Sequence, residues 1–256
     1  MTHEELVESL RSLRLKGILD EYLNVARIAE KEQNSYEQYL FMLANIELER
    51  RHDAKIKKLI KDAKLPILKE LGEYDYTKVK GVTAKQINRL AAGDFLREGQ
   101  NIVFYGTFGV GKTHLAIGLI KRLCERHYRC LFTPTAALIE ALLDAKKNLA
   151  LGQLWRKLDR YDLIVCDELG YIPQTKEGAD LFFQFISQRY ERKSLLITTN
   201  LTYSEWDKVF LNEITTAAAV DRIIHKCETY NLQGPSWRRQ EALKNKKIID
   251  DKTKVA

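Results

Sequence analysis

The amino-acid sequence predicts an α/β protein in which a five-stranded parallel sheet lies between helices, preceded by a small all-helical domain. Five short segments rich in apolar and β-branched residues alternate with helix-like stretches from residue 100 onward. Near the N-terminus, apolar positions instead recur at spacings of mostly three or four, which indicates amphipathic helices. An all-β fold is disfavoured, because 4 prolines and 13 glycines in 256 residues supply few turns.

The N-terminal helices are predicted from this periodicity and from helix-start signals. The apolar stripe over residues 4–31 predicts one helix or a helix pair. Ser35, with Gln38 three residues on, has the spacing of a capping box, so a further helix should start there. It can run to Leu65, since Pro66 should stop it. Its basic side either is a solvated face or contacts DNA; the residues expected at DNA are Arg50, Arg51, Lys55 and Lys58.

The strands are predicted from apolar runs that are continuous rather than alternating. Such runs are typical of a sheet that is buried on both faces, built from parallel βαβ units. The five segments are residues 101–106, 129–134, 162–168, 194–200 and 228–234.

The domain organisation follows from these changes along the chain. We expect residues 1–72 to form the helical N-terminal domain, with contacts to DNA, a partner or a neighbouring subunit. Residues 73–99 are expected to be a linker with one short helix over 84–92. Residues 100–240 should form the α/β domain, and residues 241–256 a basic C-terminal tail.

Composition and charge indicate a folded protein without a membrane span, and they allow a nucleic-acid partner. With 45% hydrophobic and 30% charged residues, the chain has enough apolar surface to offset the entropy of ordering. No run approaches the ~18 apolar residues that a membrane span requires, and the charged N-terminus lacks an export signal, so a cytoplasmic protein is expected. The formal charge of +7 permits attraction to a polyanion, which makes nucleic acid a candidate partner.

The cysteines do not predict a metal site or a disulfide framework. They are scattered, without C-x-x-C pairing or histidines at ligand spacing, and are expected to be buried thiols in a reducing compartment. They are Cys124, Cys130, Cys166 and Cys227.

A glycine-rich phosphate-binding motif follows the first predicted strand directly. It has the pattern G-x-x-x-x-G-K-T between a strand and a helix, the context in which this motif binds phosphates through backbone N–H groups. Lys112 should reach the β- and γ-oxygens of a nucleotide, and the Thr113 hydroxyl should ligate Mg²⁺. The residues expected to bind ATP are Gly106, Thr107, Phe108, Gly109, Val110, Gly111, Lys112, Thr113 and His114.

Two further strand ends complete a predicted ATP-hydrolysing site. The apolar run that ends in Asp167 and Glu168 puts one carboxylate where it can bind Mg²⁺ and the other where it can deprotonate an attacking water. Asn200 ends the next strand. If that strand lies between the other two, Asn200 would help to position the water. The expected catalytic residues here are therefore Lys112, Glu168 and Asn200, with Thr113 and Asp167 at the metal.

These three strand ends resemble the AAA+ ATPase module, with Walker A at residues 106–113, Walker B at Asp167 and Glu168, and sensor 1 at Asn200. Over nearly the whole chain, the sequence resembles the IstB family, the helper ATPases of insertion-sequence transposition, which are related to DnaC-type helicase loaders. The segments that carry this resemblance are LRSLRLKG (10–17), DELGY (167–171), RYE (189–191), TNL (199–201) with EW (205–206), DR (221–222) and GPSWR (234–238).

The resemblance implies a function and partners. IstB-like proteins assemble into ATP-dependent oligomers on double-stranded DNA and act with a cognate transposase, here in the bacterial cytoplasm at the nucleoid. AAA+ sites are completed by a neighbour's arginine, and Arg222 is our candidate for that finger, although a surface salt bridge to Asp221 is the alternative. Arg238 is a candidate for sensor 2, but Pro235 stands where the family more often has Glu, so we do not assign it.

Members of this clade carry an extra helical element before Walker B. Residues 136–160 are too long for a single helix and are expected to form that element, either as DNA-binding or as packing helices. Its basic residues, which could bind phosphates with little sequence preference, are Lys146, Lys147, Arg156 and Lys157.

Three alternative functions remain open at this point. A replicative helicase loader of the DnaC type would share every ATP-site residue, and the LRSLRLKG segment favours the transposition helper. A small-molecule P-loop kinase would need an arginine-rich lid and would have little use for Glu168. A DNA-binding scaffold without ATPase activity is disfavoured, because all the expected catalytic residues are present.

Overall fold

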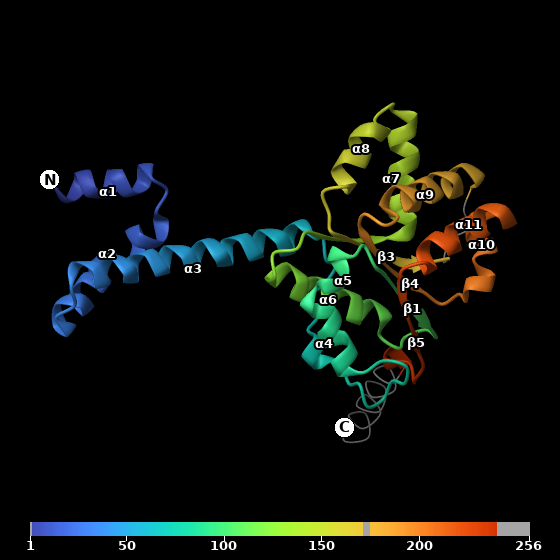
Figure 1. The fold of residues 1–256 in the computed structure, drawn as a ribbon, viewed down its shortest axis with the longest axis horizontal. Coiled ribbons are helices and arrows are strands. Elements are labelled where there is room, and N and C mark those ends of the chain that lie inside the picture. Colours follow the sequence, from blue (N-terminus) through green and yellow to red (C-terminus); the bar gives the residue numbers. More distant parts are fainter. Residues whose placement is uncertain (1, 171–174, 240–256) are drawn as a thin grey trace, which may run out of the picture. The chain divides into compact units, whose positions relative to one another are not determined.

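A computed structural model describes residues 2–170 and 175–239 of the chain. The chain divides into two compact units, Met1–Lys58 and Leu59–Ala256, and each is described by itself. Figure 1 gives the elements of both units. Among the described residues, no helix is both long and apolar enough to cross a membrane.

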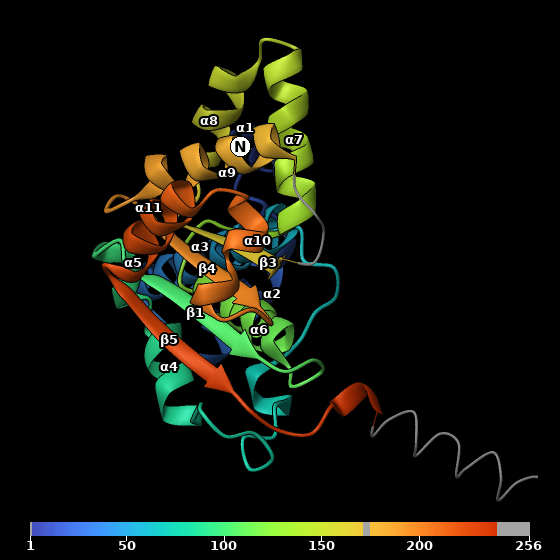
Figure 2. The same cartoon turned by 90° about the vertical axis from the view of Figure 1, so that its right-hand side faces the viewer.

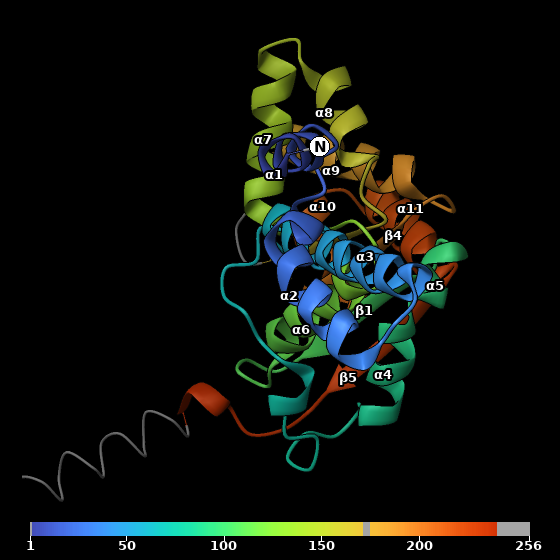
Figure 3. The same ribbon diagram turned by 90° about the vertical axis from the view of Figure 1, so that its left-hand side faces the viewer.

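The first unit is built from α1 (His3–Ser12), α2 (Lys16–Glu32) and most of α3 (Tyr36–Asp62) (Figures 1 and 3). The stripe over residues 4–31 therefore forms a helix pair, separated at Arg14, whose φ of 56° is left-handed. Ser35 and Gln38 form the expected capping box, with hydrogen bonds of 2.7 and 3.2 Å between their side chains and backbones. The helix ends at Asp62, three residues before the expected end at Leu65.

A buried carboxylate connects α3 to the start of α2. The side chain of Glu47 is 7% exposed and accepts a hydrogen bond of 2.6 Å from the Gly17 N–H, at the N-terminal end of α2. It also forms an ion pair of 2.7 Å with Arg51. A negative charge at a helix N-terminus stabilises the unpaired N–H groups there. Gly17, the second residue of α2, leaves room for this contact, because a Cβ at this position would come within 2.9 Å of the Glu47 carboxylate.

The second unit contains a five-stranded sheet in which every neighbouring pair is parallel, as predicted (Figure 2). The strand order is β2-β3-β4-β1-β5. β4 therefore lies between β3 and β1, which is the condition for Asn200 to face the other two strand ends. The strands are β1 (Asn101–Gly106), β2 (Cys130–Pro134), β3 (Leu163–Leu169), β4 (Ser194–Thr199) and β5 (Cys227–Leu232).

Helices cover both faces of this sheet. One face packs on a core that includes η1 (Leu71–Glu73), α4 (Ala84–Ala92), α5 (Asp94–Arg97) and α6 (Lys112–Glu125). The other face packs on a second core, to which α7 (Thr135–Lys147), α8 (Leu151–Leu158), α9 (Lys176–Arg189), α10 (Asp207–Phe210) and α11 (Glu213–Ile224) contribute. A short 3-10 turn, η2 (Tyr203–Glu205), precedes α10. Alternating strand residues serve the two cores, as Val103 and its neighbours Ile102 and Phe104 show.

The segment over residues 73–99 is not a linker between the two units. It lies inside the second unit, where Val79, Val82 and Ile87 are buried in the same core as α6. Its expected helix over residues 84–92 is present as α4, started by a capping box at Thr83. The segment also pairs with the end of the sheet, because Lys80 forms an antiparallel bridge with Gln233. Its few apolar residues are enough to bury it, since nearly all of them point into one core.

The extra helical element before β3 consists of two helices, α7 and α8, which form a hairpin that projects from the sheet-bearing unit (Figures 2 and 3). Leu138, Ile139 and Leu142 of α7 are buried in the second core, whereas the far end of the hairpin is exposed. The expected basic tail, residues 241–256, lies outside the described residues.

Candidate functional site

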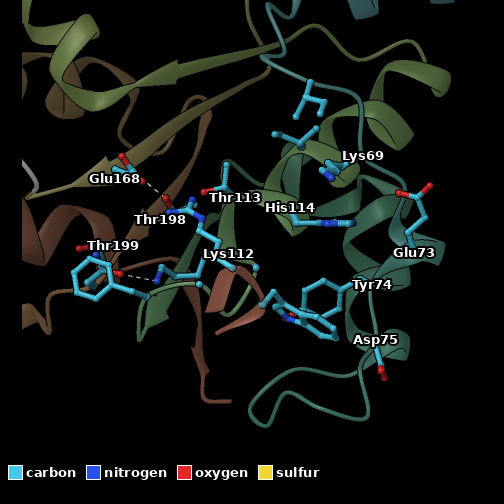
Figure 4. A pocket seen from close by; sticks show the side chains of 18 residues that line it. Lys69, Glu73, Tyr74, Asp75, Lys112, Thr113, His114, Glu168, Thr198 and Thr199 are labelled. Carbon is cyan, nitrogen blue, oxygen red and sulfur yellow. Dashed lines mark hydrogen bonds between the residues drawn. The ribbon is translucent and has the colours of Figure 1, made fainter. Parts of the chain in front are cut away.

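A cavity of about 390 Å³ opens at the carboxyl ends of β1 and β4, directly in front of the α6 N-terminus. In Figure 4, Lys112 and Thr113 lie between Glu168 and Thr198 on one side and Tyr74 and His114 on the other. Ligands of parallel α/β sheets bind at this edge. The cavity is lined by Ile67, Lys69, Glu73, Tyr74, Asp75, Phe108, Gly109, Gly111, Lys112, Thr113, His114, Ile117, Glu168, Thr198, Thr199, Asn200, Trp237 and Arg238.

Lys112 is 9% exposed, and its ammonium group donates three hydrogen bonds. The acceptors are the carbonyls of Gly106 and Thr107, at 2.7 and 2.8 Å, and the side-chain oxygen of Asn200, at 2.6 Å. Burial lowers the pKa of Lys112 to about 8, although the carboxylates of Asp167 and Glu168 favour its charged form. These bonds connect the first residue of α6 to the glycine-rich loop and to the end of β4.

The loop conformation depends on glycine at Gly109 and Gly111, whose φ values are 78° and 94°. At Gly111 a Cβ would also come within 2.5 Å of the Tyr74 ring. The loop thus ends at the first turn of α6, where the N–H groups that have no partner within the helix can receive an anion.

Thr113 and Asp167 lie side by side. The Thr113 hydroxyl donates to the Asp167 carboxylate at 3.0 Å, and Asp167 is 7% exposed. Burial raises the pKa of Asp167, which the hydrogen bonds from Thr198 and Thr113 oppose. A hydroxyl and a carboxylate are hard oxygen donors of the kind that Mg²⁺ prefers, so this pair fits the metal that the sequence predicts.

Asp167 and Glu168 are both held by one residue of the next strand. The hydroxyl of Thr198 donates to the Asp167 carboxylate at 2.5 Å and accepts a bond of 2.9 Å from the Glu168 N–H. Glu168 has a left-handed φ of 58°, and the register of β3 against β4 shifts between Cys166 and Leu169. This irregularity places both carboxylate-bearing residues at the same edge of the sheet.

Two segments from outside the glycine-rich loop bind its carbonyls. The hydroxyl of Tyr74, a buried residue, donates to the carbonyl of Val110 at 2.8 Å. The backbone N–H of Trp237 donates to the carbonyl of Gly109 at 3.0 Å. Lys78 lies 4.8 Å from the centroid of the Trp237 ring, which attaches this second segment to the one that carries Tyr74. Both segments therefore fix the shape of the loop.

The other residues predicted to bind ATP differ in whether their side chains are accessible from the cavity. Phe108 is 65% exposed and His114 lines the cavity, with its ring hydrogen-bonded to the carbonyl of Glu70 at 2.9 Å. The side chain of Val110 is fully buried, so this residue can contribute only its backbone.

Arg222 is not among the residues that line the cavity. It lies on α11, where its guanidinium group donates to the carbonyl of Ala218 at 3.0 Å and sits 4.9 Å from the Phe183 ring centroid. It forms no salt bridge to Asp221 in the part of the chain that the structure describes. The structure thus keeps Arg222 away from the nucleotide cavity of its own chain.

The predicted DNA-contacting residues are not equally available. Arg51 is bound to Glu47, and Lys146 forms an ion pair of 2.8 Å with Glu177 of α9. Lys147, Arg156 and Lys157 are exposed on the α7–α8 hairpin and form no ion pair within the described ranges. Arg50, Lys55 and Lys58 lie on α3 in the first unit.

Sequence reasoning missed several residues at this cavity, above all Tyr74 and Trp237. Both lie far from the motif in the chain, and only the tertiary structure brings them to it. Thr198 was within reach of prediction, because it stands two residues before Asn200 and alternate strand residues share a face.

The sheet order, the phosphate-binding loop and the carboxylates at the end of β3 define a P-loop ATP-binding module of the AAA+ type. A sequence profile of the IstB-like ATP binding proteins matches residues 8–245, and the chain belongs to this family.

Two relatives are similar over most of the chain. A Pseudomonas aeruginosa protein named for ATP binding and insertion sequence IS21 is 31% identical over 252 residues, which cover 98% of this chain and 95% of that protein. A Sinorhizobium fredii protein, likewise named for an insertion sequence and ATP binding, is 35% identical over 239 residues, covering 93% and 80%.

Solved structures show the same fold in the ATP-binding part. The DnaC helicase loader is 25% identical, with a TM-score of 0.51, and the match covers 58% of this chain and 87% of that one. DnaI is 18% identical, also with a TM-score of 0.51, and covers 70% and 92%.

Proposed function

We propose that this protein is an ATP-hydrolysing helper of insertion-sequence transposition, which assembles on double-stranded DNA with little sequence preference and brings its transposase to target DNA. One observation carries the proposal: in a chain of the IstB-like family, Lys112 is hydrogen-bonded to Asn200 and Thr113 to Asp167, beside Glu168 in one cavity. Relatives named for insertion sequences supply the biological setting.

The arrangement supports ATP hydrolysis in which Glu168 acts as the general base. A water attacks the γ-phosphorus, the bond between that phosphorus and the β–γ bridging oxygen breaks, and the proton of the water passes to Glu168. Asn200 orients the water from the β4 end. Lys112 binds the β- and γ-oxygens, for which it must exchange its present carbonyl acceptors. Mg²⁺, held by Thr113 and Asp167, would neutralise charge on the phosphate oxygens.

We propose that a neighbouring subunit supplies a second positively charged side chain, an arginine, to the γ-phosphate. Arg222 does not line its own cavity, and its guanidinium group packs on the Phe183 ring, so in an oligomer it can reach the γ-phosphate bound by the next subunit. An arginine supplied in this way stabilises the negative charge of the transition state. Nucleotide would then hold subunits together, and hydrolysis would release them.

A mixing experiment tests the shared site. Lys112→Ala removes the phosphate-binding ammonium group but leaves Arg222, whereas Arg222→Ala has the opposite defect. Each variant alone should be inactive. A mixture of the two should regain part of the ATPase activity, because some interfaces will combine Lys112 of an Arg222→Ala subunit with Arg222 of a Lys112→Ala subunit. A mixture as inactive as its components would contradict a site shared between subunits.

DNA binding is proposed to use phosphate contacts from the α7–α8 hairpin and from α3. The exposed cations of the hairpin, such as Lys147 and Arg156, are suited to a polyanion, and the contacts should be insensitive to sequence because they reach the backbone.

A replicative helicase loader is the second candidate, favoured by the 25% identity to the DnaC loader over 58% of this chain. Its partner would be a replicative helicase rather than a transposase. Affinity capture with purified helicase and purified cognate transposase as competing baits separates the two functions, since only one should bind in the presence of ATP.

Sedimentation with duplex DNA tests the central proposal. Wild-type protein should form large DNA-bound particles with ATP, and smaller ones with ADP or without nucleotide. Lys112→Ala should fail to form them, whereas Glu168→Gln should retain them without releasing phosphate. Small particles under every condition would contradict the proposal. Phosphate release from ATP without any acceptor would exclude a small-molecule kinase.

A further inference from the structure

Thr198 on β4 stands opposite the two carboxylate-bearing residues of β3. The strands pair at Cys166 with Ile197 and again at Leu169 with Thr199. Between these pairs, Asp167 and Glu168 face the single residue Thr198. Two residues against one is the arrangement of a β-bulge, which bends a strand and redirects a side chain.

The bulge has a direct consequence for the site. Consecutive residues of a regular strand point to opposite faces of the sheet, so Asp167 and Glu168 would diverge. Instead, Glu168 takes a left-handed φ of 58° and lines the cavity next to Lys112, while Asp167 contacts Thr113. That backbone region is uncommon for residues with a Cβ, so neighbouring groups must hold it.

The hydroxyl of Thr198 is the group that holds it. The same oxygen donates to the Asp167 carboxylate at 2.5 Å and accepts from the N–H of Glu168 at 2.9 Å. Thr198 is 1% exposed, so water cannot readily replace the hydroxyl if it is removed. The two carboxylates are thus placed relative to each other by one oxygen atom.

We propose that Thr198 is a positioning residue for ATP hydrolysis, which aligns Asp167 for the metal and Glu168 for the attacking water. The proposal rests on the proposed ATPase function. It predicts that loss of the hydroxyl harms hydrolysis and the response to Mg²⁺ more than it harms nucleotide binding, because the phosphate-binding loop does not touch Thr198 through any hydrogen bond between described residues.

Three variants test this role. Thr198→Val keeps the shape and removes the hydroxyl, and Thr198→Ser keeps the hydroxyl. Thr135→Val is the matched control: Thr135 is 2% exposed, and its hydroxyl donates at 2.9 Å to the main-chain carbonyl of Asp167 rather than to its carboxylate. For each variant, kcat for phosphate release, the Kd of ATP in EDTA, and the gain in nucleotide affinity on adding Mg²⁺ are measured.

For Thr198→Val we expect kcat to fall about 10- to 100-fold, on the scale of one hydrogen bond to a charged group. The gain in nucleotide affinity on adding Mg²⁺ should be smaller than in the wild type, whereas the Kd of ATP in EDTA should stay near the wild-type value. Thr198→Ser, which keeps the hydroxyl, should have a kcat and a Mg²⁺ response close to those of the wild type. Thr135→Val should keep the wild-type kcat.

Other outcomes would overturn the role of Thr198. These are an unchanged kcat and Mg²⁺ response in Thr198→Val, a loss of ATP binding in EDTA along with kcat, or an equal loss in Thr135→Val. If the wild-type protein releases no phosphate, the proposed ATPase function fails by itself, and the Mg²⁺ response still decides whether Thr198 positions Asp167.

Discussion

The ammonium group of Lys112 and the side-chain oxygen of Asn200 are 2.6 Å apart, which joins the start of α6 to the end of β4. The two residues are 88 positions apart in the chain. A substitution of Asn200 should therefore change the environment of Lys112, the residue that we propose binds the phosphates.

The pH dependence of ATP binding should report on Lys112. Its pKa is lowered to about 8, so the ammonium form dominates below that pH and is lost above it. Because the phosphates bind the ammonium form, ATP affinity should be level below pH 7 and should fall by up to about tenfold per pH unit above pH 8. Calorimetric titration from pH 6.5 to 9.5 checks this, with Lys112→Ala as the control, which should bind weakly and without this pH dependence.

Substitution of Asn200 by Asp should move that pH limit upward. A carboxylate 2.6 Å from the ammonium group favours its charged form and raises the pKa of Lys112. The same negative charge repels the γ-phosphate. Asn200→Asp should therefore lower the affinity for ATP more than it lowers the affinity for ADP. Asn200→Ala supplies the comparison, since it removes the acceptor without adding charge. A pH midpoint equal to that of the wild type in Asn200→Asp would contradict the coupling.

Loss of the Tyr74 hydroxyl should loosen the phosphate-binding loop. Tyr74→Phe removes the 2.8 Å bond to the Val110 carbonyl, and a buried carbonyl without its partner costs about 1–3 kcal/mol. We expect a lower melting temperature together with weaker ATP binding. Tyr76→Phe is the control, because Tyr76 packs against Tyr74 edge to face but donates no hydrogen bond within the described ranges. Equal effects of the two substitutions would point to ring packing instead.

A methyl group at Gly17 should destabilise the first unit alone. The added Cβ of Gly17→Ala would come within 2.9 Å of the Glu47 carboxylate and 3.1 Å of its Cα, and overpacking of this kind costs about 1–3 kcal/mol. Hydrogen exchange should quicken within residues 2–58, and the Kd of ATP should not change. Gly152→Ala, where a Cβ meets nothing within 4 Å, should leave exchange in both units unchanged or slower.

The salt dependence of DNA binding should separate free cations from paired ones. Lys147→Ala and Arg156→Ala should each reduce the slope of log K against log salt by about 0.9 if each contacts one phosphate. Lys146→Ala should reduce it less, because Lys146 is already paired with Glu177. Fluorescence anisotropy with a labelled duplex at several salt concentrations measures these slopes. Identical slopes for all three variants and the wild type would place DNA elsewhere.

Much of the fold was predictable because its signals are local. The β1 run and the α4 helix have the predicted bounds, and the predicted capping box of Ser35 and Gln38 is present, since such signals are read from neighbouring residues. The motifs also assign Thr113 and Asp167 to one metal ion, and the structure brings these two side chains together. The prediction of a linker over residues 73–99 is wrong, because a few apolar residues without strong periodicity do not indicate the core that they share.

The rest of the site could not be predicted from local patterns. Asp167 and Glu168 are adjacent in the sequence, and nothing in that pair indicates that a bulge will turn both toward one cavity. Tyr74 and Trp237 bind carbonyls of the glycine-rich loop from segments that lie before β1 and after β5. Such contacts join segments that are distant in the chain, where sequence periodicity carries no information.

The segments that carry Tyr74 and Trp237 hold the phosphate-binding loop from opposite ends of the second unit's sequence. Nucleotide at 100 times its Kd adds about 2.7 kcal/mol to the folded state by mass action. Because the loop shares hydrogen bonds with both segments, this gain should protect residues near 74 and near 237 together from proteases, although neither segment supplies the phosphate-binding lysine. A bound nucleotide would then stabilise two segments that are distant in the chain and that it need not contact itself.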